Sequence, residues 1–205
     1  MSVKKNEQQY WNLPNALTVL RLLLVPVYIA VFLVGSKYRA LAVFVVACLT
    51  DFLDGRIARR FQLITNFGKL MDPLADKIMV LTAMFSMAIG NPPFIQPVIP
   101  WSAVIILLLK ECIMIWGGLK LYSHGIVTHS SPIGKVAQVV FVFALIATYF
   151  HDQLAAVLPH WFMAPDILLL WIAVALTLSA LLYYVISSLR NAAAMGIIGQ
   201  GKREG

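Results

Sequence analysis

The stretch from Asp51 to Asp76 reads DFLDGRIARRFQLITNFGKLMDPLAD, and it decides how the rest of the chain is interpreted. It holds four of the nine acidic residues, in two pairs: Asp51 with Asp54, three apart, and Asp72 with Asp76, four apart. Residues three or four apart share one face of a helix, so each pair can present two carboxylates together. Because four negative charges near an apolar environment repel one another, this stretch predicts a bound cation.

The composition around this stretch predicts an integral membrane protein. Of the 205 residues, 60% are hydrophobic and 12% are charged, and the mean hydropathy of +0.83 is too high for an ordinary soluble domain. The net charge of +7 gathers at the chain ends and between apolar runs, which favours topology signals and anionic lipid over nucleic acid. Cys48 and Cys112 lie inside apolar runs and show neither a disulfide framework nor zinc-ligand spacing.

Six apolar runs predict an all-α fold, a polytopic membrane bundle of six transmembrane helices. The runs cover about residues 16–35, 39–61, 68–90, 98–122, 132–150 and 167–189. The first run has no small-residue cleavage site after it, so we expect it to be retained as a span. The whole chain, 1–205, is expected to be one membrane domain, with an N-terminal interfacial segment at 1–12 and a polar tail at 191–205. Pro73 predicts that the third span either begins or bends near that residue.

The basic residues predict that both termini and the aspartates face the cytoplasm. Six spans place the two chain ends on one side of the membrane, and cytoplasmic loops carry an excess of Lys and Arg. The opposite loops hold Lys37 and Arg39. The terminus side holds Lys4, Lys5, Arg56, Arg59, Arg60, Lys69, Lys120, Lys135, Arg190, Lys202 and Arg203.

The small residues between the aspartates indicate a phosphate-bearing ligand. Gly55 and Ala58 continue the helical face of the first aspartate pair, and Gly68 continues that of the second. Small side chains beside carboxylates let phosphate groups come close to bound metal. Oxygen ligands without His or Cys select Mg²⁺, Mn²⁺ or Ca²⁺, and carboxylates in this number can hold two ions about 4 Å apart. Surface ion pairs, the simpler explanation, contribute at most about 1 kcal/mol each and do not account for the cluster.

The spacing D-x-x-D-G-x-x-A-R, then eight residues, then G-x-x-x-D-x-x-x-D resembles the signature of the CDP-alcohol phosphatidyltransferases. Its fixed positions are Asp51, Asp54, Gly55, Ala58, Arg59, Gly68, Asp72 and Asp76. The opening segment NLPNALTVLR, Asn12 to Arg21, is similar to the start of bacterial phosphatidylglycerophosphate synthases and of the related cardiolipin synthases. The resemblance covers most of the chain, the second half more loosely.

The resemblance implies transfer of the phosphatidyl group from CDP-diacylglycerol to an alcohol or phospholipid acceptor, with release of CMP, in a bacterial plasma membrane. By this resemblance Asp51, Asp54 and Asp72 hold two divalent cations, Mg²⁺ or Mn²⁺, and Asp76 adjoins the metals and acts as general base. By the same resemblance, the residues that face CDP-diacylglycerol are Gly55, Ala58, Arg59 and Gly68. Membrane lipids and a second copy of the chain, in a homodimer, are the other implied partners.

The acceptor is less well specified than the donor. Glycerol 3-phosphate is the first expectation, because its phosphate needs cations and the second half of the chain supplies candidates. These are Lys110, Lys120, Lys135 and Arg190. Phosphatidylglycerophosphate synthases usually carry Arg-Glu where this chain has Lys110-Glu111, and a second Arg where it has Gly118. The same run also resembles cardiolipin synthases, so phosphatidylglycerol stays open as the acceptor, and Lys120 and Arg190 can also be topology signals.

Other features leave further alternatives. Carboxylates in a membrane also mark ion pathways, so a membrane cation transporter is a competing class. The chain shows no internal repeat, and the small residues suit a bulky ligand, which favours the enzyme. Arg21 either snorkels to the membrane surface, supports the structure or meets an anionic ligand. His124, His129, His151 and His160 lack ligand spacing and are expected at the surface or the membrane interface.

Overall fold

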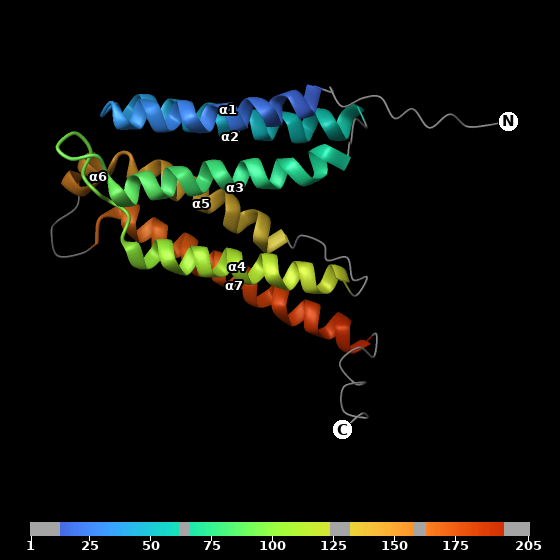
Figure 1. Ribbon diagram of the computed structural model, residues 1–205. Coiled ribbons are helices and arrows are strands. Elements are labelled where there is room, and N and C mark those ends of the chain that lie inside the picture. The colour runs from blue at the N-terminus through green and yellow to red at the C-terminus, as the bar shows by residue number, and fades with distance from the viewer. Residues whose placement is uncertain (1–12, 62–65, 124–131, 158–162, 195–205) are drawn as a thin grey trace. The chain divides into compact units, whose positions relative to one another are not determined.

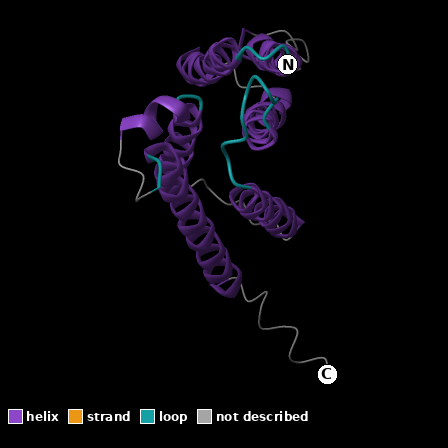
Figure 2. Ribbon diagram, turned by 90° about the vertical axis from the view of Figure 1, so that its left-hand side faces the viewer, coloured by secondary structure: helices purple, strands orange, loops and turns teal. Residues whose placement is uncertain are grey.

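The computed structural model describes residues 13–61, 66–123, 132–157 and 163–194, and these segments are helical throughout most of their length (Figure 1). The helices are α1 (Leu13–Leu33), α2 (Lys37–Phe61), α3 (Asn66–Ile89), α4 (Trp101–Ser123), α5 (Pro132–Thr148), α6 (His151–Val157) and α7 (Pro165–Ala194). Within these segments no strand occurs beyond an isolated bridge between Asn91 and Ile95, and Figure 2 shows helices and loops alone. The all-α prediction is therefore confirmed.

The long helices match the six predicted spans to within a few residues, but the count of six membrane crossings is not established. Three of the described helices are long and apolar enough to cross a membrane, with windows at Ala16–Leu33, Trp101–Gly118 and Pro165–Ser188. A fourth crossing arises if α5 and α6, which are bent by 86° at a short break, form one span. The helices α2 and α3 are not among the three, and they are the two that carry the aspartate stretch.

Three boundaries differ from the sequence prediction. The short helix α6 was not expected, because the sequence after Phe150 is too polar and too short to resemble a span. Helix α7 continues to Ala194, so the first residues of the predicted tail are helical. Helix α3 begins at Asn66, so Pro73 lies inside the helix and does not mark its start. The predicted N-terminal interfacial segment lies outside the described residues.

The chain forms two compact units, Met1–Val98 and Ile99–Gly205. In the first unit, α1 packs against both α2 and α3. The side chains that α1 buries recur at helical spacing: Thr18, Arg21, Tyr28 and Phe32 are each at most 3% exposed. On α2 the buried positions include Ala40 and Ala47, whose small side chains let neighbouring helices approach closely.

The ends of α1 and α3 in the first unit are joined by Asn91. Its Nδ2 donates hydrogen bonds to the carbonyl oxygens of Leu33, at 2.8 Å, and Phe32, at 3.3 Å. The last carbonyls of a helix have no partner within the helix, so this side chain satisfies two of them. In the same turn the backbone N–H of Asn91 donates a hydrogen bond to the backbone carbonyl oxygen of Ile95, at 2.7 Å. The junction is therefore closed by side-chain and backbone hydrogen bonds.

Gly90, just after α3, provides a test of this junction. Its φ of +71° is strained for an L residue, and an added Cβ would lie 2.7 Å from the carbonyl oxygen of Ile95. We expect Gly90→Ala to lower the free energy of unfolding by about 1–3 kcal/mol, since backbone cannot move aside as a flexible side chain can. The matched control is Gly117→Ala, where the nearest atom, in Tyr184, is 3.9 Å away. Thermal unfolding in detergent checks this; equal stability of the two variants would contradict it.

The second unit is built on α7, which packs against α4, α5 and α6. Helix α5 buries Ala137, Phe141, Ala144 and Leu145. At the start of α6, the His151 Nδ1 lies 2.8 Å from the Oδ2 of Asp166, whose side chain is fully buried in the first turn of α7. The His151 side chain is 30% exposed, which agrees with the predicted position at the surface, and its ring is also held by this carboxylate. His124, His129 and His160 lie outside the described residues.

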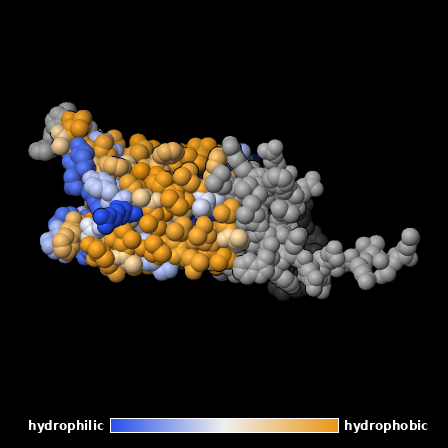
Figure 3. Space-filling model, turned by 90° about the horizontal axis from the view of Figure 1, so that it is seen from above, coloured by the Kyte–Doolittle hydropathy of each residue, from blue (hydrophilic) through white to orange (hydrophobic). Residues whose placement is uncertain are grey.

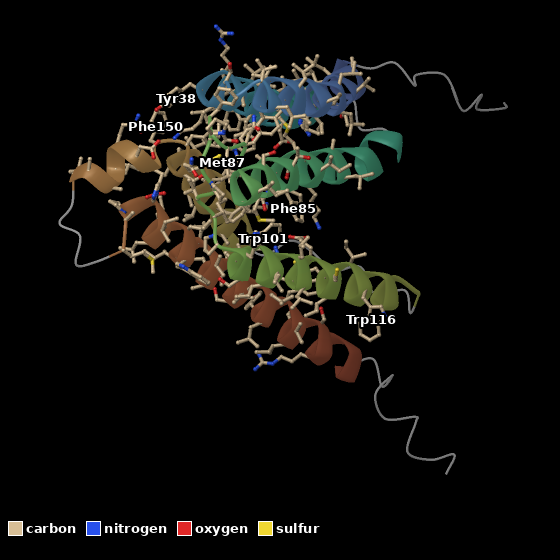
Figure 4. All side chains as sticks on the ribbon, turned by 60° about the vertical axis from the view of Figure 1, so that its left-hand side comes forward. Tyr38, Phe85, Met87, Trp101, Trp116 and Phe150 are labelled. Atoms are coloured by element: carbon tan, nitrogen blue, oxygen red, sulfur yellow. The ribbon has the colours of Figure 1, made fainter. Side chains whose placement is uncertain are left out.

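The outer surface agrees with a membrane environment. Large apolar side chains are widely exposed, among them Leu23, Phe143 and Trp116. The Trp116 side chain, which projects from α4 in Figure 4, belongs to a residue that is 68% exposed. Figure 3 shows a face that is mostly hydrophobic, with hydrophilic residues gathered toward one end. A soluble protein rarely exposes so large an apolar surface, whereas lipid chains cover it without penalty. Cys48 and Cys112 are both free.

Candidate active site

Asp51 lies at the end of the α2 stripe that faces the interior of the first unit. Ala40, Phe44 and Ala47 are all fully buried, and Asp51 follows Ala47 by four residues on the same face. The aspartate itself is not sealed, since its side chain is 44% exposed. The helix therefore carries this carboxylate from the apolar core to an accessible position.

Arg21 of α1 meets this carboxylate. The Arg21 Nη1 lies 3.0 Å from the Oδ1 of Asp51, and the arginine side chain is 1% exposed. A buried guanidinium is costly unless a carboxylate compensates its charge, which explains why the two side chains come together. Snorkelling to the membrane surface is therefore wrong for Arg21, because the face of α1 that carries it is turned toward α2.

Asp76 of α3 approaches the same region. Val80, Ala83 and Met87 follow it at four, seven and eleven residues and are buried, so Asp76 stands on the inward stripe of α3. The charges of Asp51, Asp76 and Arg21 all act on the Cys48 thiol. Charged side chains from the three helices of this unit therefore lie near Cys48. The sequence singled out the two aspartates; no spacing rule pointed to their convergence with Arg21.

The other predicted site residues belong to the same helices. Asp54, Gly55, Ala58 and Arg59 lie within α2, and Gly68 and Asp72 lie within α3. Their side chains are outside the described residues. In the part of the chain whose side chains are described, no group of three or more metal-ligating side chains occurs. The four-aspartate metal site therefore stays a prediction, and the described geometry covers one carboxylate of each pair.

The candidate acceptor residues belong to the second unit. Lys110 on α4 is 9% exposed, and its Nζ lies 2.5 Å from the Oε1 of Glu111. Adjacent residues point to different sides of a helix, but these two side chains are long enough to reach sideways and meet. Lys135 on α5 and Arg190 on α7 are exposed. The side chain of Lys120 is outside the described residues.

Comparison with known proteins identifies the class to which this fold and site belong. The family model of the CDP-alcohol phosphatidyltransferases matches residues 11–190, and the chain belongs to this family. The match spans both compact units and the whole aspartate stretch, which confirms the resemblance seen in the spacing of the eight fixed positions. The protein is accordingly a membrane protein, as its apolar helices indicate.

Three bacterial relatives of this chain share one name. The chain is 31% identical over 154 residues, 66% of its length, to the CDP-diacylglycerol–glycerol-3-phosphate 3-phosphatidyltransferase of Bacillus subtilis (strain 168), of which 77% is covered. It is 49% identical over 73 residues, 34% of its length, to the enzyme of that name from Rickettsia typhi (strain ATCC VR-144 / Wilmington). It is 46% identical over 76 residues, 36% of its length, to that from Pseudomonas fluorescens. These two matches span only 40% and 39% of the relatives' own lengths.

Proposed function

We propose that this protein transfers the phosphatidyl group of CDP-diacylglycerol to glycerol 3-phosphate, forming phosphatidylglycerophosphate and releasing CMP. The observation that carries the proposal is the ion pair between the buried Arg21 and Asp51, with Asp76 near the same thiol, Cys48, in a chain that the family model matches over residues 11–190. Family membership supports the donor and the reaction class. The choice of acceptor is supported by the name that the bacterial relatives share.

The described carboxylates fit a hard divalent cation. Asp51 and Asp76 offer oxygen donors from two helices, and Asp51 stays 44% exposed although one of its oxygens meets Arg21. We propose that these two residues, together with Asp54 and Asp72, hold two Mg²⁺ or Mn²⁺ ions. When bound, such ions neutralise charge on the pyrophosphate and on the leaving CMP. Gly55, Ala58, Arg59 and Gly68 are proposed to face the CDP moiety of the donor.

Asp76 is proposed as the general base. The acceptor hydroxyl loses its proton to the Asp76 carboxylate as its oxygen forms a bond to the donor phosphorus, and the bond between that phosphorus and the CMP oxygen breaks. General-base assistance of this kind contributes typically about 10²- to 10⁴-fold in rate. The helical scaffold holds Asp76 on the inward stripe of α3, which supports a base with a fixed position.

The acceptor phosphate is proposed to contact basic residues of the second half. Lys135 and Arg190 are exposed and can reach an anion, whereas Lys110 is nearly buried and already paired with Glu111. Lys120 completes the proposed set. We further propose one membrane domain over residues 1–205, a site facing the cytoplasm of a bacterial plasma membrane, and a homodimer.

The acceptor assay is the direct test of this function. With Mg²⁺ or Mn²⁺ and CDP-diacylglycerol, the purified protein is expected to release CMP when glycerol 3-phosphate is added. Glycerol is the matched control, because it presents the same hydroxyls without the phosphate, and we expect far less CMP with it. CMP release with phosphatidylglycerol instead would identify the alternative, a cardiolipin synthase. Cation flux through proteoliposomes without CMP release from any acceptor would contradict the enzyme and favour a transporter.

A further inference from the structure

The pair of Arg21 and Asp51 carries an inference about how the candidate site is held together. We propose that Arg21 is a positioning residue, whose guanidinium fixes the orientation of the Asp51 carboxylate and so directs its accessible side toward a divalent cation. The cation in this statement rests on the proposed function. The orientation of Asp51 by Arg21 does not depend on that function.

The burial of the two partners is strongly asymmetric. The side chain of Arg21 is 1% exposed, whereas that of Asp51 is 44% exposed. An ion pair on the surface leaves both side chains free to move and contributes little to structure. Here the guanidinium is enclosed between helices, so it has few alternative positions. Arg21 is therefore the fixed member of the pair, and Asp51 is the member presented to the site.

The packing around Arg21 explains why it is fixed. Thr18 and Tyr28, on the same face of α1, are fully buried, and so are Phe44 and Ala47 on the facing helix α2. Closely packed neighbours leave a long side chain few rotamers. The planar guanidinium also presents its donors in a rigid fork, which suits it to hold a carboxylate in one orientation. The 3.0 Å separation of Nη1 and Oδ1 is an ion-pair contact with one carboxylate oxygen.

Arg21 also adds positive charge to the site. The effect of this charge on cation binding is opposite to the effect of orienting the Asp51 carboxylate. Its charge and those of Asp51 and Asp76 act on one thiol, that of Cys48, so they lie near one another. A positive charge here relieves repulsion between the carboxylates but also repels a divalent cation. Losing the charge would strengthen cation binding, whereas losing the orientation would weaken it. The substitution Arg21→Lys separates the two effects, because lysine keeps the charge and lacks the fork.

The first experiment measures Mn²⁺ binding to the full chain in detergent by calorimetry, without donor or acceptor. We expect Arg21→Lys to bind Mn²⁺ about 10-fold or more weakly than the wild type, as for other residues that orient metal ligands. The matched control is Arg39→Lys, an exposed residue at the other end of α2, which should bind like the wild type. Wild-type affinity in Arg21→Lys would overturn the proposal and leave Arg21 as a charge-balancing residue.

The second experiment needs neither metal nor turnover and covers the case in which Arg21→Lys does not fold. Thermal unfolding is compared for the wild type, Arg21→Gln, Asp51→Asn and the double variant. If the arginine holds the carboxylate, the two substitutions are not additive. The Tm of the double variant should then be about 3 °C or more above the value expected from adding the Tm shifts of the two single variants. Additive shifts would overturn the proposal. Coupling in a protein that releases no CMP would support the contact between Arg21 and Asp51 and reject the proposed function.

Discussion

Asp76→Asn is expected to reduce CMP release by about 10²- to 10⁴-fold while Mn²⁺ and CDP-diacylglycerol still bind. An asparagine side chain has nearly the same shape and keeps one carbonyl oxygen as a donor to the metal. It cannot accept the proton of the attacking hydroxyl, so chemistry fails while binding survives. CMP release at saturating donor, metal and glycerol 3-phosphate measures the first effect, and calorimetry with Mn²⁺ measures the second.

A second acidic residue provides the control for this substitution. Asp152→Asn removes a carboxylate from the exposed surface of α6, far along the chain from the aspartate stretch, and should leave CMP release near the wild-type rate. If Asp76→Asn instead loses Mn²⁺ binding as severely as it loses turnover, Asp76 is mainly a metal ligand and the base must be sought elsewhere.

Asp51→Asn is expected to act differently, with loss of the metal as its main effect. The substitution removes a negative charge from the proposed cation site, so Mn²⁺ affinity should fall by about 100-fold or more. Losing a metal ligand should cost at least as much affinity as losing a residue that only orients a ligand. It also deprives the buried guanidinium of Arg21 of its counter-charge. We therefore expect a lower stability, by about 1–2 kcal/mol, since the half-exposed position lets water replace part of the lost interaction.

The two measurements together separate the roles of the aspartates. Mn²⁺ titration and thermal unfolding of Asp51→Asn and Asp76→Asn are run side by side under the same detergent conditions. The expected pattern is a large affinity loss with reduced stability for Asp51→Asn, and a large turnover loss with nearly normal affinity for Asp76→Asn. The opposite pattern would exchange the two assignments, and wild-type Mn²⁺ binding in both variants would place the metal elsewhere.

Most of the fold was predictable because it depends on local hydrophobic runs. The long helices α1 to α5 and α7 begin and end within a few residues of the predicted spans, since charged residues, Gly90 and the prolines after Asn91 interrupt the apolar sequence. The short α6 and its 86° bend from α5 escaped prediction. That bend is accompanied by the contact between His151 and Asp166, a pair separated by fifteen residues that no periodic pattern connects.

The candidate site was predictable in its acidic residues but not in its basic partner. The spacing of Asp51 and Asp76 within the family pattern is a property of the sequence alone, whereas the position of Arg21 admitted several explanations. Lys110 and Glu111 show the same limit, because adjacent positions do not face each other on a helix and yet their long side chains form an ion pair. Side-chain reach and helix rotation are not encoded in spacing.

Hydropathy and residue spacing along the chain predict the membrane class, the positions of the long helices, the family and the four candidate aspartates. Only the packing of the helices shows that Arg21 is buried with its Nη1 3.0 Å from the Oδ1 of Asp51, and that Asp76 of α3 lies near the same thiol, Cys48. The physical reason is that such contacts depend on how α1, α2 and α3 rotate and pack against one another. That rotation is set by the buried stripes of all three helices together, and by no one of them separately.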